Sequence, residues 1–235
     1  MLKHDKWLSE KLGKESYRLT STSELMTAND PRKNLADCEF IYGLVPTEEL
    51  AELHFLESHG FNLVDTRISF EKLAMKLDFE ATKKLTLRHA KPEDKQEVCE
   101  IAGSDFVFSR FHLDPKISTQ SADFIKKEWI ANFFSKKRGD DMLIAEKDGK
   151  VAGFLSILFT TSDKKAVIDL VCVSKEFQKQ GIGQQLLGFF ENEYAGCTLN
   201  VGTQIANIAS IRCYTAAGFR AVESKYIIHR HQNDS

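Results

Sequence analysis

Residues 167–187, VIDLVCVSKEFQKQGIGQQLL, bring a strand, a turn and a helix together in one short stretch. The apolar, β-branched run at 167–173 is typical of a buried strand. It stops at the polar turn QKQGIG (178–183), and a helix then begins with apolar residues at helical spacing: Ile182, Leu186, Leu187 and Phe190. A helix that follows a glycine-containing turn presents unpaired backbone N–H groups and a positive dipole end. The stretch therefore predicts a phosphate-type anion site.

The length and net charge of the chain limit the number of domains and the kinds of partner to be expected. The chain has 235 residues, of which 42% are hydrophobic, and a net charge of −2. This length suffices for one large domain or two small ones. A near-neutral balance gives no reason to expect nucleic acid or an anionic membrane as a partner. Any anionic ligand must be held by local groups.

Cysteine usage and the N-terminus indicate a cytoplasmic protein. The five cysteines are odd in number and form no CxxC motif, so free thiols in a reducing compartment are expected. The first residues are charged, and no stretch approaches the roughly 20 apolar residues that span a bilayer. The histidines have no metal-ligand spacing, so no metal is expected.

Residues 1–80 are expected to form a small N-terminal α/β domain. Short strands or an edge segment are predicted around residues 7–19, and a strand at 35–44. A helix is predicted from an N-cap at Thr47 to Gly60, followed by one or two strands at 61–77. A unit this small buries little by itself, so we expect it to pack on the rest of the chain, beyond a polar linker at 80–84.

Residues 81–235 are predicted to form an α/β (α+β) domain with one central mixed sheet. The expected order is β-α-α-β-β-β-α-β-α-β. The strands are expected at 85–89, 142–145, 151–159, 167–173, 197–201 and 219–229, and the helices at 92–102, 123–137, 181–194 and 207–217.

The turn resembles a known signature. The pattern Gln178-x-x-Gly181-x-Gly183, between a strand and a helix, is identified as the Q/R-x-x-G-x-G/A acyl-CoA signature of the GNAT acetyltransferases. A Rossmann motif fails because Leu186 replaces its third glycine, and a P-loop fails because no Gly-Lys-Ser/Thr follows. Three other segments resemble the family: LRHA with PED at 87–94, VAGF at 151–154, and the N…Y…GF pattern of Asn207, Tyr214, Gly218 and Phe219.

The resemblance implies a GNAT fold and acetyl-CoA as the acyl donor. The turn would hold the CoA pyrophosphate, with Lys179 adding charge, and main-chain groups of the preceding strand would pair with the pantetheine amides. The implied acetyl-CoA-binding residues are Leu170, Val171, Cys172, Val173, Gln178, Lys179, Gln180, Gly181, Ile182, Gly183, Asn207 and Tyr214.

Two residues are expected to be catalytic. The resemblance implies that Tyr214 protonates the leaving thiolate, the alternative being that its ring packs in the core. Asp169 is the one acid in its apolar strand, and simple alternation places it on one face with Val171 and Val173. It is either the general base for the attacking amine or the partner of a cation on the sheet. The usual family glutamate would fall near Val167, so a water molecule remains an alternative base.

Other segments resemble, within this family, the dTDP-fucosamine acetyltransferases of enterobacterial common antigen synthesis. They are SRFH at 109–112 with the helix that carries Trp129, residues 201–207, and more loosely the N-terminal part. This implies a nucleotide-activated (dTDP) amino sugar as acceptor, and a dimer. The implied acceptor residues are Ser109, Arg110, Phe111, His112, Thr203 and Gln204.

Each acceptor residue has an expected role and a plain alternative. Arg110 would pair with the diphosphate, and Phe111 and Phe108 would stack on thymine. His112 would contact sugar hydroxyls together with the polar residues at 203 and 204. The alternative is that residues 106–111 form a hydrophobic plug. Two other functions stay open: acetylation of another small amine or a protein N-terminus, and a non-catalytic module that binds acyl-CoA.

Overall fold

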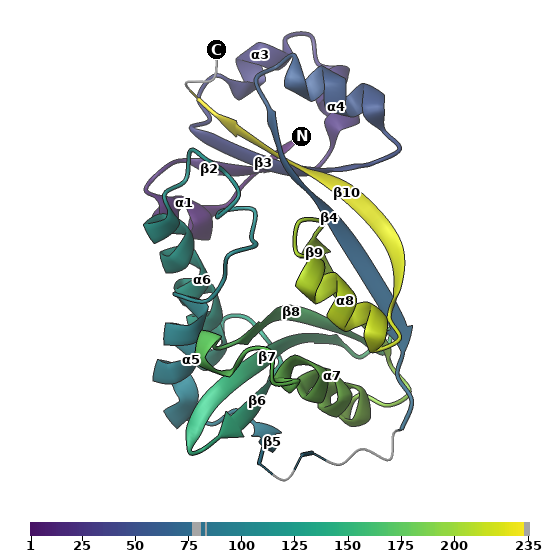
Figure 1. The fold of residues 1–235 in the computed structure, drawn as a ribbon. Helices are drawn as coiled ribbons and strands as arrows, with labels where there is room; N and C mark the ends of the chain where they lie inside the picture. Colours follow the sequence, from purple (N-terminus) through teal and green to yellow (C-terminus); the bar gives the residue numbers. More distant parts are fainter. Residues whose placement is uncertain (77–80, 83, 233–235) are drawn as a thin grey trace.

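The computed structural model describes residues 1–76, 81, 82 and 84–232, and its described strands form one ten-stranded mixed sheet. The strand order is β1-β2-β3-β10-β4-β9-β8-β7-β6-β5 (Figure 1). The strands are β1 (Leu2–His4), β2 (Ser16–Leu19), β3 (Phe40–Pro46), β4 (Asn62–Leu73), β5 (Thr86–His89), β6 (Asp141–Lys147), β7 (Lys150–Thr160), β8 (Lys165–Val173), β9 (Thr198–Gln204) and β10 (Arg220–His231). The helices are α1 (Lys6–Leu12), α2 (Thr22–Met26), α3 (Pro31–Leu35), α4 (Leu50–Glu57), α5 (Lys95–Ala102), α6 (Thr119–Phe134), α7 (Ile182–Glu193) and α8 (Ile208–Ala216), with single 3₁₀ turns at Pro92–Asp94 and Lys175–Phe177.

The N-terminal part differs from its prediction in several places. The strand expected at 35–44 begins only at Phe40, and helices α2 and α3 are additional to the predicted elements. The segment expected as short strands contains helix α1, which Asp5 caps by accepting from the backbone N–H of Leu8 at 3.0 Å. Thr47 does not cap a helix. Its hydroxyl lies 2.6 Å from that of Ser224 on β10, and α4 begins later, after Glu49. The helix does not begin at Thr47 because β3 stays paired with β10 as far as Pro46, and this strand pairing outweighs the local capping preference.

The predicted order of elements from β5 to β10 is confirmed, with ends shifted by a few residues. The predicted hairpin turn is also present: Asp148 and Gly149 both have positive φ, at 51° and 75°, between β6 and β7. The predicted strand region at 61–77 is one long strand, β4, as far as the described residues reach.

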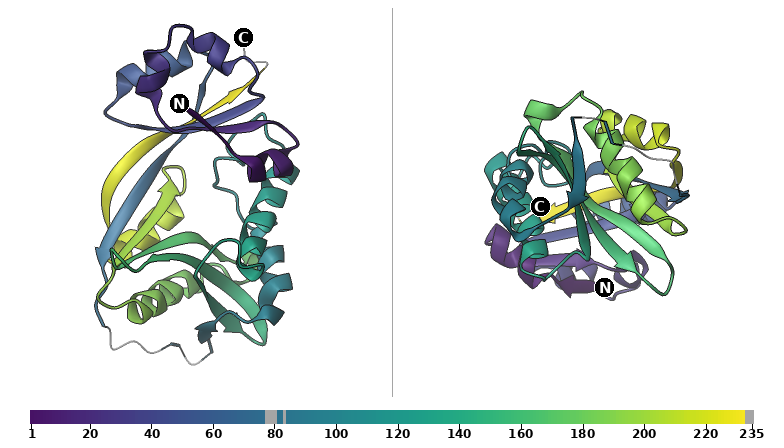
Figure 2. Two further views of the ribbon diagram at one scale, coloured as in Figure 1. Left: turned by 180° about the vertical axis from the view of Figure 1, so that it is seen from behind. Right: turned by 90° about the horizontal axis from the view of Figure 1, so that it is seen from below.

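The two predicted domains share one sheet. Strand β10 from the C-terminal end pairs antiparallel with β3 and with β4, and β4 also pairs with β9. Both views of the ribbon show β4 and β10 running side by side along the length of the molecule (Figures 1 and 2). The expected boundary at residue 80 lies outside the described residues, and so does part of the expected linker at 80–84. The N-terminal part therefore packs on the rest mainly through backbone pairing.

Strand β8 contains a bulge at Asp169. On β7, Ser156 pairs with Leu170 but its neighbour Ile157 pairs with Ile168, so Asp169 is the extra residue. Strand β8 pairs in parallel with β9 only over Lys165–Ile168, whereas β9 continues along β4 to Gln204. The second halves of β8 and β9 therefore separate and leave an opening in the sheet.

The bulge makes one prediction wrong. Simple alternation places Asp169 on one face with Val171 and Val173, but those valines pack with the cluster that includes α7. Asp169 instead contacts Trp129 of α6, a helix on the other face of the sheet. An extra residue in a strand shifts the alternation by one position, and the sequence pattern does not reveal it.

Helices cover both faces around this opening. Helices α7 and α8 pack on one face through Leu186, Phe190 and Tyr214, and α5 and α6 pack on the other through Val98 and Ile130. All five cysteine thiols are free, as predicted. None of the helices in the described ranges is long and apolar enough to cross a membrane.

Candidate functional site

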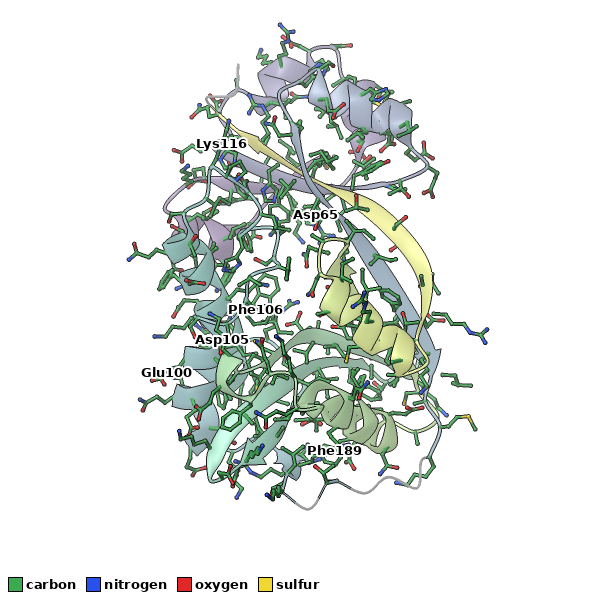
Figure 3. The ribbon with its side chains drawn as sticks, viewed as in Figure 1. Asp65, Glu100, Asp105, Phe106, Lys116 and Phe189 are labelled. Carbon is green, nitrogen blue, oxygen red and sulfur yellow. The ribbon has the colours of Figure 1, made fainter. Side chains whose placement is uncertain are left out.

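A cavity of about 1710 Å³ lies where β8 and β9 separate, and both halves of the chain line it. Its walls come from α1, β2 and β3 of the N-terminal part, and from α6, β8, the 178–183 turn, β9 and α8 of the rest. The segment at 105–111 forms another wall. Figure 3 shows Phe106 of this segment beside α6, on the side that faces the middle of the molecule. Most of the predicted donor and acceptor residues therefore line one cavity, and the exceptions are Gln180 and His112.

The predicted anion site is open. Gly181 precedes α7 with a φ of 77°, and no side chain among the described residues caps the first N–H groups of that helix. A Cβ built on Gly181 would meet nothing within 4 Å. The Gln178 side chain folds back and donates to the Val173 carbonyl at 3.0 Å, which fixes the turn. The free N–H groups at the helix end thus face the cavity, as binding of a phosphate requires.

The strand beside the turn contributes its backbone rather than its side chains. Leu170 and Cys172 point into the core, and burial raises the pKa of the Cys172 thiol to about 12, so this thiol is no nucleophile at neutral pH. The separation of β8 from β9 leaves one edge of residues 169–173 for a peptide-like ligand. Asn207 lines the cavity nearby and caps α8 by accepting from the N–H of Ser210 at 3.2 Å.

Tyr214 packs in the core and also reaches the cavity, so its position is compatible with both alternatives from the sequence. Its ring packs against Phe70 and Phe219, with centroids 5.8 and 6.1 Å away, and it also lines the cavity. Burial raises the pKa of Tyr214 well above its ordinary value, although its hydrogen bond with Ser210 acts in the opposite direction. The hydroxyl is therefore protonated at neutral pH, which is the state that a general acid needs.

Asp169 forms an ion pair. Arg138 donates to both of its carboxylate oxygens, at 2.8 and 2.7 Å, and the indole N–H of Trp129 donates at 2.9 Å. The Arg138 guanidinium also stacks on the Trp129 ring, 4.7 Å from its centroid. Of the two alternatives for Asp169, the structure shows the cation partner. A base role for Asp169 stays a prediction, and it would compete with three hydrogen bonds.

The residues of the 109–112 segment differ in whether they reach the cavity or are held in other contacts. His112 lies outside the cavity lining, because its ring bonds to the Ser109 hydroxyl at 2.7 Å and to the Asp123 carboxylate at 2.9 Å. Phe111 is 1% exposed and packs with Leu8 in the core, as the plug alternative holds. Stacking on a nucleobase is more accessible to the half-exposed Phe108, which also lines the cavity.

Arg110 does line the cavity, and aromatic rings hold it there. Its guanidinium carbon lies 3.8 Å from the centroid of Tyr42 and 4.3 Å from that of Phe111. Burial lowers the pKa of Arg110 to about 10, which still leaves it charged at neutral pH. The Tyr42 hydroxyl in turn donates to Asp5 at 2.6 Å.

Thr203 and Gln204 end β9 at the edge of the cavity. They pair with Ile68 and Arg67 of β4, so their placement depends on a strand from the N-terminal part. The Arg67 guanidinium covers Gly202 so closely that a Cβ there would overlap it. Because Gly202 has no side chain, the Arg67 guanidinium can lie against it and form part of the cavity wall.

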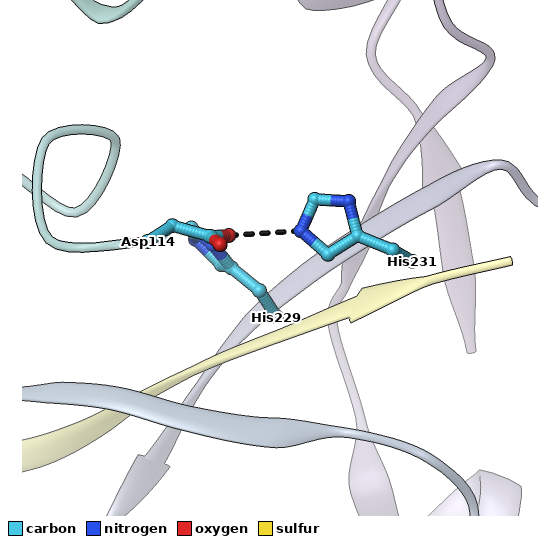
Figure 4. Close-up of side chains that lie close together, drawn as sticks. All are labelled: Asp114, His229 and His231. Atoms are coloured by element: carbon cyan, nitrogen blue, oxygen red, sulfur yellow. Dashed lines mark hydrogen bonds and ion pairs between the residues drawn. The ribbon is translucent and has the colours of Figure 1, made fainter. Parts of the chain in front are cut away.

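Asp114, His229 and His231 form a buried cluster that sequence reasoning missed. Both histidine rings bond to the same carboxylate oxygen of Asp114, at 2.6 and 2.9 Å (Figure 4). One ligand atom from each residue lies within 4.8 Å of the others, so the set is close enough to hold a metal ion. Burial lowers the pKa of His229 to about 4. Residues 114 and 229 are far apart in sequence, so ligand spacing could not find them.

The cluster also fixes Arg110. The other ring nitrogen of His229 lies 3.5 Å from the Arg110 guanidinium, so a neutral His229 can accept from it while donating to Asp114. This chain of contacts joins the 109–114 segment to β10 and aims the guanidinium at the cavity.

The charge of the cavity is the second feature that the sequence does not reveal. Among the described residues, ten cationic side chains line it: Lys3, Arg18, Arg67, Arg110, Lys126, Lys137, Arg138, Lys179, Arg212 and Lys225. Only three acids accompany them: Asp5, Asp105 and Asp169. This excess exists in a chain whose net charge is −2. The cations come from positions 3 to 225 and form no local run, so only the fold brings them together.

Comparison with known proteins agrees with this geometry. Residues 96–219 match the model of the acetyltransferase (GNAT) family, which is more than half of the chain. The spore coat polysaccharide biosynthesis protein SpsD of Bacillus subtilis is 28% identical over 202 residues, which cover 84% of this chain and 68% of that protein.

Solved structures show the same fold at low identity. A protein of unknown function from Staphylococcus epidermidis aligns with a TM-score of 0.63 at 16% identity, over 92% of this chain and 84% of that one. A GCN5-related N-acetyltransferase from Sphaerobacter thermophilus aligns with a TM-score of 0.57 at 16% identity, over 82% of this chain and 60% of that one. Given the family match, the fold and the open turn before α7, the chain belongs to the GNAT family of acetyltransferases.

Proposed function

We propose that this protein transfers the acetyl group of acetyl-CoA to the amino group of a nucleotide-linked amino sugar, of the dTDP type. The excess of cationic side chains in the cavity carries this proposal. A nucleotide sugar brings a diphosphate in addition to the phosphates of CoA, and both need cations when they leave water. The enzyme would belong to the acyltransferases.

The position of the cations supports an anionic acceptor. Lys179 lies in the turn before α7, where the CoA pyrophosphate would bind. Lys3 and Arg18 belong to β1 and β2, at the far end of the strand order, and Arg110 stacks on Tyr42 of β3. A small neutral amine would leave this second group of cations without a role. The name of SpsD, which refers to polysaccharide biosynthesis, agrees with a sugar acceptor.

The residues suggest direct attack on the thioester. The α7 N-terminus would hold the pyrophosphate, and the free edge of β8 would align the pantetheine arm. The free amine would then attack the carbonyl carbon, and Tyr214 would donate its proton to the departing thiolate. A non-catalytic acyl-CoA module is the weaker alternative, because it would not need a buried, protonated tyrosine in the cavity.

Thermal shift and thiol release test the proposal. Acetyl-CoA should raise the Tm, and dTDP- or UDP-linked amino sugars should raise it further, because a ligand that binds only the folded state stabilises it. CoA thiol should appear only with sugars that carry a free amine; dTDP-glucose is the matched control. If no nucleotide sugar shifts the Tm, while another small amine releases thiol, the acceptor assignment is wrong.

A charge variant separates the two ligands. Arg18→Gln should weaken binding of the nucleotide sugar roughly tenfold, the usual effect of losing one charge-assisted contact, and leave acetyl-CoA binding unchanged. Arg32→Gln, an exposed change on α3 outside the cavity lining, is the control. Equal effects of the two changes would contradict a diphosphate site near β2.

A further inference from the structure

Lys126 is a buried lysine that lacks an ionic partner. It lies on α6, is 9% exposed and lines the cavity. Asp94, Asp114 and Glu191, the other buried side chains with a formal charge in the described ranges, each have a cationic or histidine partner. Within those ranges Lys126 has no hydrogen bond or ion pair, and its ammonium contacts only the rings of Phe106 and Trp129, at 5.1 and 5.5 Å from their centroids.

This environment disfavours the charged form of the amine. Burial is the main cause that lowers the pKa of Lys126 to about 8, and the positive charge of Arg110 lowers it further. Arg138 acts in the same direction, while Asp169 and Cys172 on β8 act in the opposite direction. A neutral lysine amine is a good proton acceptor, whereas an exposed lysine is nearly all protonated at neutral pH.

Lys126 lies in the part of the cavity where a base could reach the amino group of the acceptor. The residues that influence its charge include Asp169 and Cys172, which both follow the point where β8 leaves β9, after Ile168. Lys126 reaches the cavity from α6 on one face of the sheet, and Tyr214 reaches it from α8 on the other. The carboxylate of Asp169 already accepts three hydrogen bonds from Arg138 and Trp129, whereas the Lys126 amine forms none with the described residues and can accept a proton without breaking one.

We propose that Lys126 is the general base that removes the proton from the acceptor ammonium. The inference rests on the proposed acetyl transfer. The Lys126 amine takes one proton from R–NH₃⁺, and the free amine forms a C–N bond to the thioester carbonyl carbon. As the C–S bond breaks, the sulfur takes the Tyr214 proton, and the second proton of the new amide nitrogen replaces it on Tyr214. Lys126 then releases its proton to solvent.

The pH profile follows from this step. The base acts when it is deprotonated, so turnover should rise with pH through about 8 and then level off. The groups that face Lys126 from the packed elements are Arg110, Arg138, Asp169 and Cys172. Arg110 has its pKa at about 10 and Cys172 at about 12, and Arg138 has its pKa raised, so none of these three titrates near pH 8.

Two variants of Lys126 separate a base from a binding charge. Lys126→Met should lower kcat about 100-fold, remove the rise near pH 8 and leave the KM for acetyl-CoA unchanged. Lys126→Arg keeps the charge but cannot lose a proton at this pH, so it should not restore kcat. Lys127→Met, an exposed neighbour on α6, is the matched control. Recovery of kcat in Lys126→Arg, or an unchanged pH profile in Lys126→Met, would overturn the proposal.

A measurement without any acceptor keeps the test independent of the proposed function. Trace labelling of the wild-type amines with acetic anhydride, at pH 6 to 11, reports the protonation of each lysine by mass spectrometry. The labelling of Lys126 should have its midpoint near pH 8, well below the value of about 10.4 that an unperturbed lysine has. A midpoint above 10 for Lys126 would overturn its role as a base. Failure of every nucleotide sugar as acceptor would overturn the proposed function instead.

Discussion

Individual side chains in the cavity take their chemistry from their neighbours. Asp169 is a carboxylate on an apolar strand, yet Arg138 and Trp129 occupy both of its oxygens. Tyr214 is buried against two other aromatic rings, and burial raises its pKa, so its hydroxyl stays protonated at neutral pH. Lys126 is one of many lysines, and burial between two rings lowers its pKa. Residue type alone assigns none of these roles.

Tyr214→Phe tests the general acid at the residue scale. Removing the hydroxyl should lower kcat by about 100-fold or more, because the thiolate must then leave without a proton. The dissociation constant of acetyl-CoA, measured by calorimetry, should change little, since the ring still packs on Phe70. Tyr194→Phe removes a half-buried hydroxyl that is not in the cavity lining, and should leave kcat unchanged. Unaltered turnover in Tyr214→Phe would end the assignment.

Two local elements prepare the donor site. The turn before α7 needs a residue with a φ of 77° and no side chain to cover the first N–H groups, and Gly181 satisfies both conditions. The bulge at Asp169 ends the pairing of β8 with β9 and frees a strand edge. The turn is visible in the sequence because its chemistry is local. The bulge is not visible, because it depends on the register between β7 and β8.

Gly181→Ala tests the turn at the element scale. An alanine with positive φ costs about 1–2 kcal/mol, so the Tm should fall by a few degrees. The new methyl group would also point into open space in front of the helix N-terminus, so acetyl-CoA binding should weaken at least tenfold. Gly149→Ala has the same positive φ and the same open space in a hairpin. It should cost similar stability with no loss of binding, and equal binding losses in both variants would refute the anion site.

The whole molecule depends on pairing between distant parts of the chain. Strand β4, from the first 80 residues, lies between β9 and β10, and β10 has β3 on its other side. The family match covers 96–219, so neither β4 nor β10 belongs to the matched region. The cavity also depends on both halves of the chain, because each half supplies some of its cationic side chains. The proposed donor and acceptor sites are thus built on one sheet.

Division of the chain tests this dependence. Residues 81–235 alone should be insoluble or lack a cooperative thermal transition, because β10 would lose both neighbours and β9 would expose an edge. Co-expression with residues 1–80 should restore a soluble complex. Deletion of residues 1–4 removes only edge strand β1 and should leave the transition in place. A fragment 81–235 that unfolds cooperatively and binds acetyl-CoA would show an independent domain.

The sequence by itself determined the α/β class, the order of elements from β5 to β10, and the glycine turn with its helix. These follow from hydrophobic periodicity and from local backbone chemistry, which neighbouring residues specify. Only the tertiary structure decided that β4 lies inside the sheet, that Asp169 is bulged and paired, and that Phe111 is core. It also decided that Lys126 is buried without an ionic partner among the described residues and that Asp114 meets two histidines. Long-range register, burial and charge arise from contacts between residues far apart in the chain, and no local pattern encodes them.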